Sequence, residues 1–570
     1  MRVKHEKALA NSCERSTEYP AVMNAMSVSS SSALAARLRG SLWWLLPLAF
    51  AATLRFGGLP GQVLIDDEIH ALRYAHERDT RWLLTNYSRT DYGRPLALLY
   101  RAYWQAGIPL QEMGARLPGV LAGLLLVVGV PLAARRAGLT EASGWLAWLL
   151  AISPLLVFHS RIARTYMPAT LLAHAAVWCA LMWMERGERL WASAYAVCAA
   201  LAAQWHLVVI PFVLLPLPFA AAREWLVPIG KRRGWWTLAA TGAATVGGLL
   251  ALQAPTLESL VTVLRHNTSA DRVAWDTLLI NARLQMGSRS ALVAFLLLGL
   301  ALFGLWRLRC RPILLAYTLT LAAGHVAALL FSRPLDVHIP HILARYLIVA
   351  LPLLLLWVAC GLVQAAALTG SRLTGVAVLV LVAATGPFAR PAHWRSTLSH
   401  HVSLLRFDCS VPEIPRDAVP RFYAELGREP GSATLIEFPW DLTSASRAAL
   451  AFQLHHRQAI IGAPAKWTYL DEPVFRLHWL VAPKLESFLS SSARYLVVHR
   501  HPRAEEQLVV SGTCPGMLQG PAALQAARDA AAPEMERELR AHWGSPAFDD
   551  GPIVVWDLAR LRSTMTGSSP

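Results

Sequence analysis

Long apolar runs separated by short polar turns occupy the chain from about residue 41 to residue 390. A helix that crosses the ~30 Å hydrocarbon core of a bilayer needs about 20 largely apolar residues. The runs predict eleven membrane-spanning helices, at residues 41–56, 117–134, 142–158, 166–184, 190–204, 206–222, 235–253, 290–307, 312–331, 346–364 and 372–388. The run at 95–108 is too short to cross and carries Arg101, so it predicts a helix on the membrane surface.

The chain becomes more polar after about residue 390. Short β-branched or apolar runs recur there, at residues 434–438, 458–461, 495–498 and 553–556, with helical patterns at 441–454 and 521–541. Such alternation predicts a small α/β domain over residues 391–570. Residues 1–40 are polar and serine-rich, which predicts a disordered cytoplasmic tail. The expected fold is therefore mainly α, a polytopic membrane protein with a soluble C-terminal α/β domain.

Composition agrees with that fold class. Hydrophobic residues make up 55% of the 570 residues and charged residues 16%, whereas an ordinary soluble domain carries about 25% charged residues. The 53 basic and 37 acidic residues give a net charge of +16, which basic loops facing anionic lipid explain. No basic stripe is interleaved with aromatic residues, so membrane lipids rather than nucleic acid are the expected partners.

The distribution of basic residues predicts the topology. With the N-terminus in the cytoplasm, alternate turns carry the basic clusters, as the positive-inside rule requires: Arg135-Arg136, Arg186 with Arg189, Lys231-Arg232-Arg233, Arg307 with Arg309 and Arg311, and Arg372. Counting 95–108 as a span would reverse most of these turns. The loop 57–116 and the domain 391–570 are then extracytoplasmic, on a multi-pass protein of the cell (plasma or inner) membrane.

The unusual polar residues gather on that outer face. Three consecutive acids, Asp66, Asp67 and Glu68, follow the first span. Ionised side chains beside a membrane cost free energy unless they form ion pairs or take part in function. Arg161 and Arg164 are spaced to face the same way, and two guanidinium groups suit a phosphate or diphosphate. The same face gathers His206, His338, His341 and Arg345. The pattern predicts an anion site beside a carboxylate base.

The order of these motifs resembles the GT-C class of membrane glycosyltransferases, in particular its protein O-mannosyltransferase and aminoarabinose-transferase-like branch. The matching positions, spread over residues 41–390, are Asp67-Glu68, Gly93-Arg94-Pro95-Leu96, Ser160 with Arg164 and Tyr166, Trp205-His206, and Arg345-Tyr346 with Pro352. The chain departs from the branch at Ile162, where relatives often have Glu, at Met167, and at Arg94, which replaces a proline.

The resemblance implies transfer of a sugar, with inversion, from a polyprenyl-phosphate donor to a hydroxyl acceptor on a lipid, glycan or protein. A hydroxyl nucleophile needs a carboxylate to take its proton, and arginines stabilise the departing phosphate. Asp67 is the expected general base, with Asp66 as its rival and Glu68 orienting the acceptor or tuning Asp67. The expected donor-phosphate residues are Arg161, Arg164, Tyr166, His206, Arg345 and Tyr346.

Two other functions fit a polytopic protein: a transporter or flippase for a lipid-linked glycan, and a non-catalytic subunit of envelope assembly. A transporter should show internal repeats and mid-membrane polar residues, and neither is evident in the sequence. No cofactor is assigned, and the sequence leaves open a divalent cation and the pairing of Cys409 with Cys514. The exported histidines, His455-His456 and His499 with His501, fit no standard metal spacing and are interpreted as packing or surface residues.

Overall fold

The computed structural model describes residues 44–59, 68–87, 93–108, 110, 112–226, 235–266, 268, 271–288, 290–386, 418–428, 433–439, 452, 458–460, 485–501 and 522–566. The predicted tail 1–40, Asp66, Asp67, Cys409, Cys514 and His455-His456 lie outside these residues. The predictions made for them therefore stay predictions.

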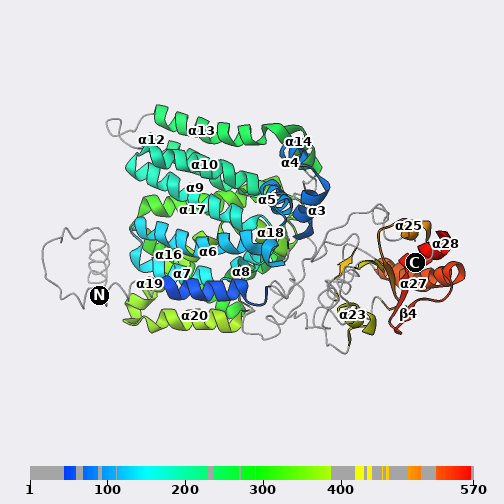
Figure 1. The fold of residues 1–570 in the computed structure, drawn as a ribbon. Coiled ribbons are helices and arrows are strands. Elements are labelled where there is room, and N and C mark those ends of the chain that lie inside the picture. Colours follow the sequence, from blue (N-terminus) through cyan, green and yellow to red (C-terminus); the bar gives the residue numbers. More distant parts are fainter. Residues whose placement is uncertain are drawn as a thin grey trace, which may run out of the picture.

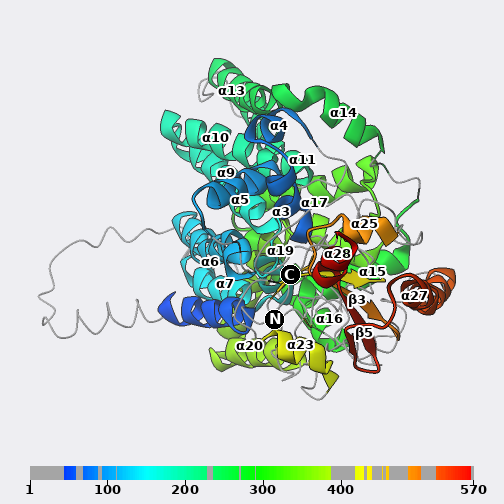
Figure 2. The same ribbon diagram turned by 45° about the vertical axis from the view of Figure 1, so that its right-hand side comes forward.

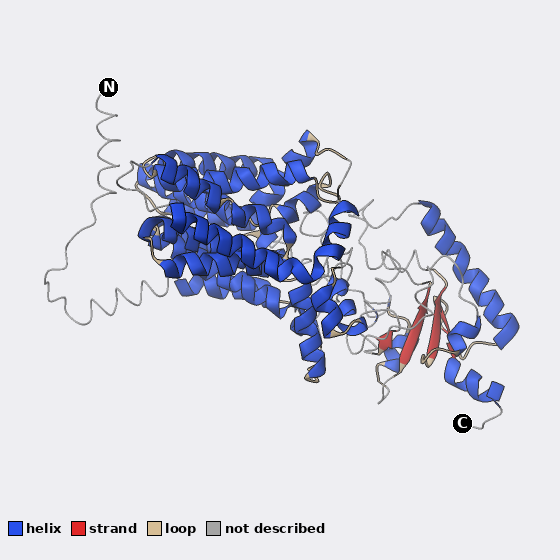
Figure 3. Ribbon diagram, turned by 90° about the horizontal axis from the view of Figure 1, so that it is seen from above, coloured by secondary structure: helices blue, strands red, loops and turns tan. Residues whose placement is uncertain are grey.

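Apolar helices run side by side in one bundle (Figures 1 and 3). They are the helix Trp44–Phe56, α6 (Glu112–Arg136), α7 (Thr140–Ile152), α8 (Pro154–Ser160), α9 (Tyr166–Arg186), α10 (Arg189–Trp205), η3 (Leu207–Val209), α11 (Ile210–Leu214), α12 (Pro216–Leu226), α13 (Trp235–Gln253), α16 (Ala291–Leu308), α17 (Pro312–Ser332), α19 (Leu351–Thr369) and α20 (Leu373–Thr385). Each of the eleven predicted spans coincides with one or more of these helices.

Helix length and apolarity support membrane crossing. Among the described residues, seven helices are long and apolar enough to span a bilayer, or eight if α7 and α8, bent by 58° at Ser153, form one span. Trp44–Phe56 and α20 are shorter apolar helices, and α10, with 17 residues, occupies the place of the predicted span 190–204.

Shorter elements gather at one end of the bundle, which we call the site end (Figure 1). They are α3 (Ile69–Glu77), α4 (Thr80–Thr85), α5 (Arg94–Gln105), η5 (Ala254–Thr256), α14 (Leu257–His266), α15 (Trp275–Met286) and α18 (Pro340–Tyr346). With only 12 residues, α5 is too short to span, as predicted. Its buried face, formed by Leu96, Ala97 and Tyr100, packs in one cluster with Ala71 and Leu72 of α3.

Basic side chains gather at the opposite end. Arg311 Nη1–H donates to the Ala137 carbonyl (2.6 Å), and Arg223 Nη1–H donates to the Met184 carbonyl (2.8 Å). Both carbonyls lie near the ends of helices that begin at the site end. The bundle thus separates a basic end from the site end, in agreement with the charge pattern of the sequence.

Two glycines permit a close contact between α16 and α19. A Cβ added to Gly304 in α16 would lie 1.8 Å from the Trp357 carbonyl oxygen, and one added to Gly361 in α19 would lie 2.0 Å from the Leu300 oxygen. Both helices therefore depend on a missing side chain at their crossing, a common solution where lipid gives no hydrophobic drive for association.

The C-terminal domain lies beyond the site end and contains a five-stranded sheet (Figures 1 and 3). The strands are β1 (Thr434–Phe438), β2 (Ala459–Ile460), β3 (Tyr495–His499), β4 (Phe548–Asp549) and β5 (Ile553–Asp557), in the order β2-β1-β3-β5-β4. The first three pair in parallel, and β5 is antiparallel to β3 and β4. The domain's helices are α23 (Arg421–Leu426), α25 (Leu485–Leu489), α27 (Ala522–Trp543) and α28 (Leu558–Thr566). Four strands and α27 were predicted, whereas the two-residue β4 was missed.

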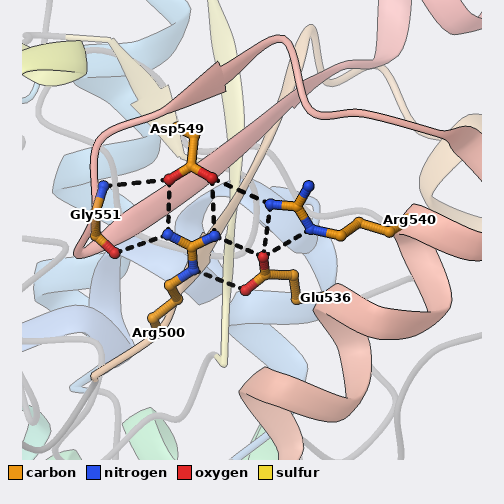
Figure 4. Close-up of polar contacts among 5 residues, drawn as sticks. All are labelled: Arg500, Glu536, Arg540, Asp549 and Gly551. Carbon is orange, nitrogen blue, oxygen red and sulfur yellow. Dashed lines mark hydrogen bonds and ion pairs between the residues drawn. The ribbon is translucent and has the colours of Figure 1, made fainter.

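An ion-pair network fastens α27 to the sheet of this domain (Figure 4). Arg500 donates to both oxygens of Glu536 (2.8 and 2.6 Å) and both of Asp549 (2.6 and 2.9 Å), and Arg540 bridges the same two acids. The hydrogen bonds from Arg500 lower the pKa of Asp549 to about 2. The preceding His499 is buried, with Nε2 2.7 Å from Glu437. The packing interpretation therefore holds for this histidine.

Candidate active site

Five of the predicted site residues meet at the site end, around the ring of Tyr166, the first residue of α9. The guanidinium carbons of Arg164 and Arg345 each lie 5.9 Å from the Tyr166 ring centroid. The His206 ring lies 4.8 Å from the same centroid, and the Tyr346 ring lies 6.3 Å from His206. Two positive charges from distant segments therefore share one aromatic surface, a favourable cation–π arrangement. We call these five residues the arginine–tyrosine cluster.

A break in the helix after α18 positions Arg345 and Tyr346. Residues 347–350 leave the regular helix before α19 begins, which frees backbone carbonyls inside the bundle. His325 Nε2–H donates to the Tyr346 carbonyl (3.1 Å), and His174 Nε2–H donates to the Val349 carbonyl (2.8 Å). These two buried histidines therefore fix the segment that presents Arg345.

The break between α10 and η3 positions His206 in a similar way. The Val208 backbone N–H donates to His206 Nδ1 (3.2 Å), so the histidine side chain caps the short helix that follows it. The ring is thereby held against Tyr166. The aromatic–histidine motif at 205–206 thus marks a helix break at the site end.

Arg161 holds the end of the first helix. Its Nη1 donates to the carbonyls of Leu54 (2.8 Å), Arg55 (3.3 Å) and Gly57 (2.6 Å), which are left unpaired at the end of the helix Trp44–Phe56. Burial, together with the positive charge of Arg116, lowers the pKa of Arg161 to about 10. The side chain therefore caps the first helix, and its role as a phosphate ligand stays a prediction.

Glu68, just before α3, is a structural ion pair. Its Oε1 and Oε2 accept from Nε and Nη2 of Arg116, both at 2.8 Å, and Oε1 also accepts the backbone N–H of Ala163 (2.8 Å). Both side chains are buried, at 2% and 0% exposed. These bonds join three segments: the end of the acidic loop, the start of α6 and the turn before Arg164. The pair fixes the backbone around Glu68, and its role in orienting an acceptor or tuning Asp67 stays a prediction.

Gly93 and Arg94 connect α5 to the same turn. Gly93 has φ +68°, and a Cβ there would lie 2.1 Å from Thr165 Cγ2, so only glycine fits without a shift. Arg94 Nη2 donates to the side-chain oxygens of Gln204 and Gln253 (2.8 Å to the latter). The arginine that replaces a proline of related motifs thus ties α5 to α10 and α13.

The described residues contain no group of three His, Cys, Asp or Glu side chains placed to hold a metal ion. Asp66 and Asp67, the other two acids of the motif, lie outside the described set.

Sequence reasoning missed several residues that support the site. Arg116 and Arg55 are fully buried arginines within apolar helices, and Arg55 donates to Ser160 Oγ (3.1 Å) and to the Ala151 carbonyl (3.2 Å). A charged residue at the site end of a predicted span was the available signal for both arginines, because such residues in membrane helices usually pair. His174 and His325 lie within predicted spans and gave the same kind of signal, but the carbonyls that they bind could not be predicted.

Comparison with known proteins was made by sequence and by structure. No family model matches the sequence, and no curated protein is similar to it at a significant level. The chain is similar in structure to ArnT from Cupriavidus metallidurans in the apo state, with a TM-score of 0.52 and 16% identity over 93% of this chain and 100% of that one.

ArnT from the same organism bound to undecaprenyl phosphate gives a TM-score of 0.51 and 15% identity over 93% and 99% of the two chains. The Archaeoglobus fulgidus oligosaccharyltransferase in complex with Zn and sulfate gives 0.40, with 11% identity over 83% of this chain and 70% of that one. Identity this low establishes fold alone. The chain therefore has the GT-C fold of ArnT, which confirms the resemblance that its motifs indicate.

Proposed function

We propose that this protein is a membrane glycosyltransferase that moves a sugar from a polyprenyl-phosphate donor to a hydroxyl acceptor at the site end of the bundle. The observation that carries the proposal is the arginine–tyrosine cluster, in which Arg164 and Arg345 share the ring of Tyr166. The two arginines come from segments about 180 residues apart in sequence, and the fold brings them together at the end of the bundle where Glu68 accepts the backbone N–H of Ala163.

The charge of the cluster fits the donor. A sugar linked to a polyprenyl phosphate leaves behind a phosphate that gains negative charge as its bond to the sugar breaks. Guanidinium groups already in place stabilise that charge without reorganisation, and their planar donors match phosphate oxygens. Arg164 and Arg345 are the proposed phosphate ligands, supported by Tyr166, His206 and Tyr346. The polyprenyl chain would lie among the apolar helices of the bundle, which suits a membrane-dissolved donor.

The acidic loop supplies the base in this proposal. The hydroxyl oxygen of the acceptor attacks the anomeric carbon while Asp67 takes the hydroxyl proton. The bond from that carbon to the phosphate oxygen breaks, and the configuration at the carbon is inverted. Asp66 is the alternative base. The ion pair of Glu68 with Arg116 anchors the chain directly after these aspartates to the turn that carries Arg164. Glu68 is thus proposed as a positioning residue.

The comparisons support the nature of the donor. ArnT, whose fold this chain shares, is known in a form bound to undecaprenyl phosphate. We infer a polyprenyl-phosphate-linked donor here as well, with the sugar and the class of acceptor open. The site end is proposed to face the extracytoplasmic side, because the arginines of the other end are expected in the cytoplasm.

The proposal is tested by mass spectrometry of lipid-linked sugars and surface glycans. Cells carrying the gene, lacking it, or complemented with Asp67→Asn, Asp66→Asn or the control Asp276→Asn are compared. Loss of the gene should remove one sugar from the envelope and raise the matching polyprenyl-phosphate sugar. The Asp276→Asn chain should restore the glycan, and Asp67→Asn should not, although it reaches the membrane at the normal level.

The results distinguish an error in the assigned base from an error in the proposed function. Failure of Asp66→Asn with normal activity of Asp67→Asn would move the base by one residue. Unchanged pools in the deletion strain would contradict the transferase itself.

A further inference from the structure

We infer that a groove on the lipid-facing side of the bundle binds an anionic phospholipid, with one acyl chain against α9 and the phosphate at Arg136. The groove is a cavity of about 180 Å³ between α6, α9 and α10, which lie on the same side of the bundle in Figure 2. It is separate from the arginine–tyrosine cluster, so this inference does not rest on the proposed transferase function.

The length of the groove matches one leaflet of a bilayer. Its lining on α9 extends from Leu171 to Met182, which at 1.5 Å per residue is roughly 16 Å. Half of the ~30 Å hydrocarbon core is about the same length. The lining on α6 runs from Gly129 to Arg136, the last residue of that helix, so this wall lies toward the basic end.

The shape of the groove suits one hydrocarbon chain. Gly129 of α6 forms part of its wall, and a Cβ built on this glycine would meet no atom within 4 Å. A dry apolar cavity of about 150 Å³ is large enough for a six-carbon ring. The volume here therefore accommodates a stretch of a single acyl chain.

Two tryptophans form part of the groove wall. Trp178 is 6% exposed and lines the groove, as does Trp191. Their rings add apolar surface against which an acyl chain packs.

Arg136 specifies the charge of the head group. It is the last residue of α6 and is exposed at the mouth of the groove, where tryptophans and arginines commonly meet the head-group layer. A guanidinium at this level attracts an anionic phosphate. The combination of an apolar wall and one cation favours an anionic phospholipid over a neutral diacylglycerol.

Native mass spectrometry of the full chain in detergent tests the inference, with phosphatidylglycerol and diacylglycerol as probes. Gly129→Leu fills the groove, whereas Gly247→Leu is a matched control: Gly247 is also exposed on a bundle helix and open to a Cβ, but it does not line the groove. Arg136→Gln removes the cation, and Arg135→Gln removes its exposed neighbour outside the groove. Thermal unfolding checks that each variant is folded.

The wild-type chain should retain one phosphatidylglycerol molecule, and Gly129→Leu should reduce its retention at least tenfold while Gly247→Leu leaves it unchanged. Arg136→Gln should weaken phosphatidylglycerol binding about fivefold, and diacylglycerol binding should not change. Equal retention by the two leucine variants would overturn the inference. Equal weakening by Arg135→Gln and Arg136→Gln would overturn the role of Arg136 and indicate a non-specific surface effect.

Discussion

Both carboxylate oxygens of Glu68 accept hydrogen bonds from Arg116 at 2.8 Å, in a pair that is almost completely buried. The same carboxylate holds the backbone N–H of Ala163, one residue before Arg164. One side chain thus links the end of the acidic loop to the turn that carries a proposed phosphate ligand. The third acid of the motif therefore has a structural role, and the assignment of the base to Asp67 or Asp66 stays a prediction.

Removing one partner of this pair should destabilise the protein strongly. In Arg116→Met the Glu68 carboxylate stays buried without its counter-ion, a change that typically costs about 3–5 kcal/mol. Glu68→Gln keeps an oxygen for the Ala163 N–H and removes the charge. The double variant Glu68→Gln, Arg116→Met should therefore be more stable than Arg116→Met alone, as measured by thermal unfolding in detergent.

The exposed Glu188→Gln is the control for this cycle, and its unfolding temperature should equal that of the wild type. A double variant whose loss is the sum of the two single losses would contradict a direct interaction between Glu68 and Arg116.

Gly93→Ala should disturb the site through Thr165. The left-handed backbone at φ +68° costs an alanine roughly 1–2 kcal/mol, and its Cβ would also overlap Thr165 Cγ2. Gly107→Ala is a matched control, because Gly107 has φ +69° but open space around a Cβ. We expect Gly93→Ala to lose more stability than Gly107→Ala.

The second change Thr165→Ser removes Cγ2 and should bring Gly93→Ala close to the control in thermal unfolding. If Thr165→Ser does not restore the stability of Gly93→Ala, the contact with Thr165 is not the reason that position 93 requires glycine.

The network of Figure 4 should make the C-terminal domain sensitive to acid. Hydrogen bonds from Arg500 lower the pKa of Asp549 to about 2, below its unfolded value of about 3.9. The stabilisation is therefore complete above about pH 4 and is lost as the pH falls toward 2. Because the Asp549 side chain is 42% exposed, solvent screening should limit the effect to about 1 kcal/mol or less.

Thermal unfolding of the full chain between pH 6 and pH 3 measures this effect. Asp549→Asn should lower the unfolding temperature of the C-terminal domain slightly at pH 6 and reduce its further decline toward pH 3. A variant whose decline parallels that of the wild type would exclude Asp549 as a source of the acid sensitivity.

Hydrophobic pattern predicted the bundle well, because a bilayer demands long apolar helices wherever the chain crosses it. The meeting of Arg164, Tyr166, His206 and Arg345 was also predictable, since alternating helices bring every second turn to the same end. Which side chains bind one another at that end could not be predicted. The charge of Arg161, or of Glu68, does not depend on whether it binds a ligand or another part of the protein. Only tertiary contacts show that Arg161 binds a helix end and that Glu68 binds Arg116. The place of Arg116 at the end of a predicted span indicated a paired residue, but its partner Glu68 could not be identified from the sequence.

Binding of undecaprenyl phosphate to the purified full chain tests the central claim most directly. Arg164→Ala and Arg345→Ala should each weaken binding by about tenfold or more, because a charge-assisted hydrogen bond contributes roughly 1.5–3 kcal/mol. Lysine at either position should recover only part of the affinity, since it lacks the planar fork. Arg272 is exposed and lies outside the arginine–tyrosine cluster, so the control variant Arg272→Ala should bind undecaprenyl phosphate as the wild type does. Unchanged affinity in both Arg164→Ala and Arg345→Ala, with the fold intact, would contradict a donor phosphate at the arginine–tyrosine cluster.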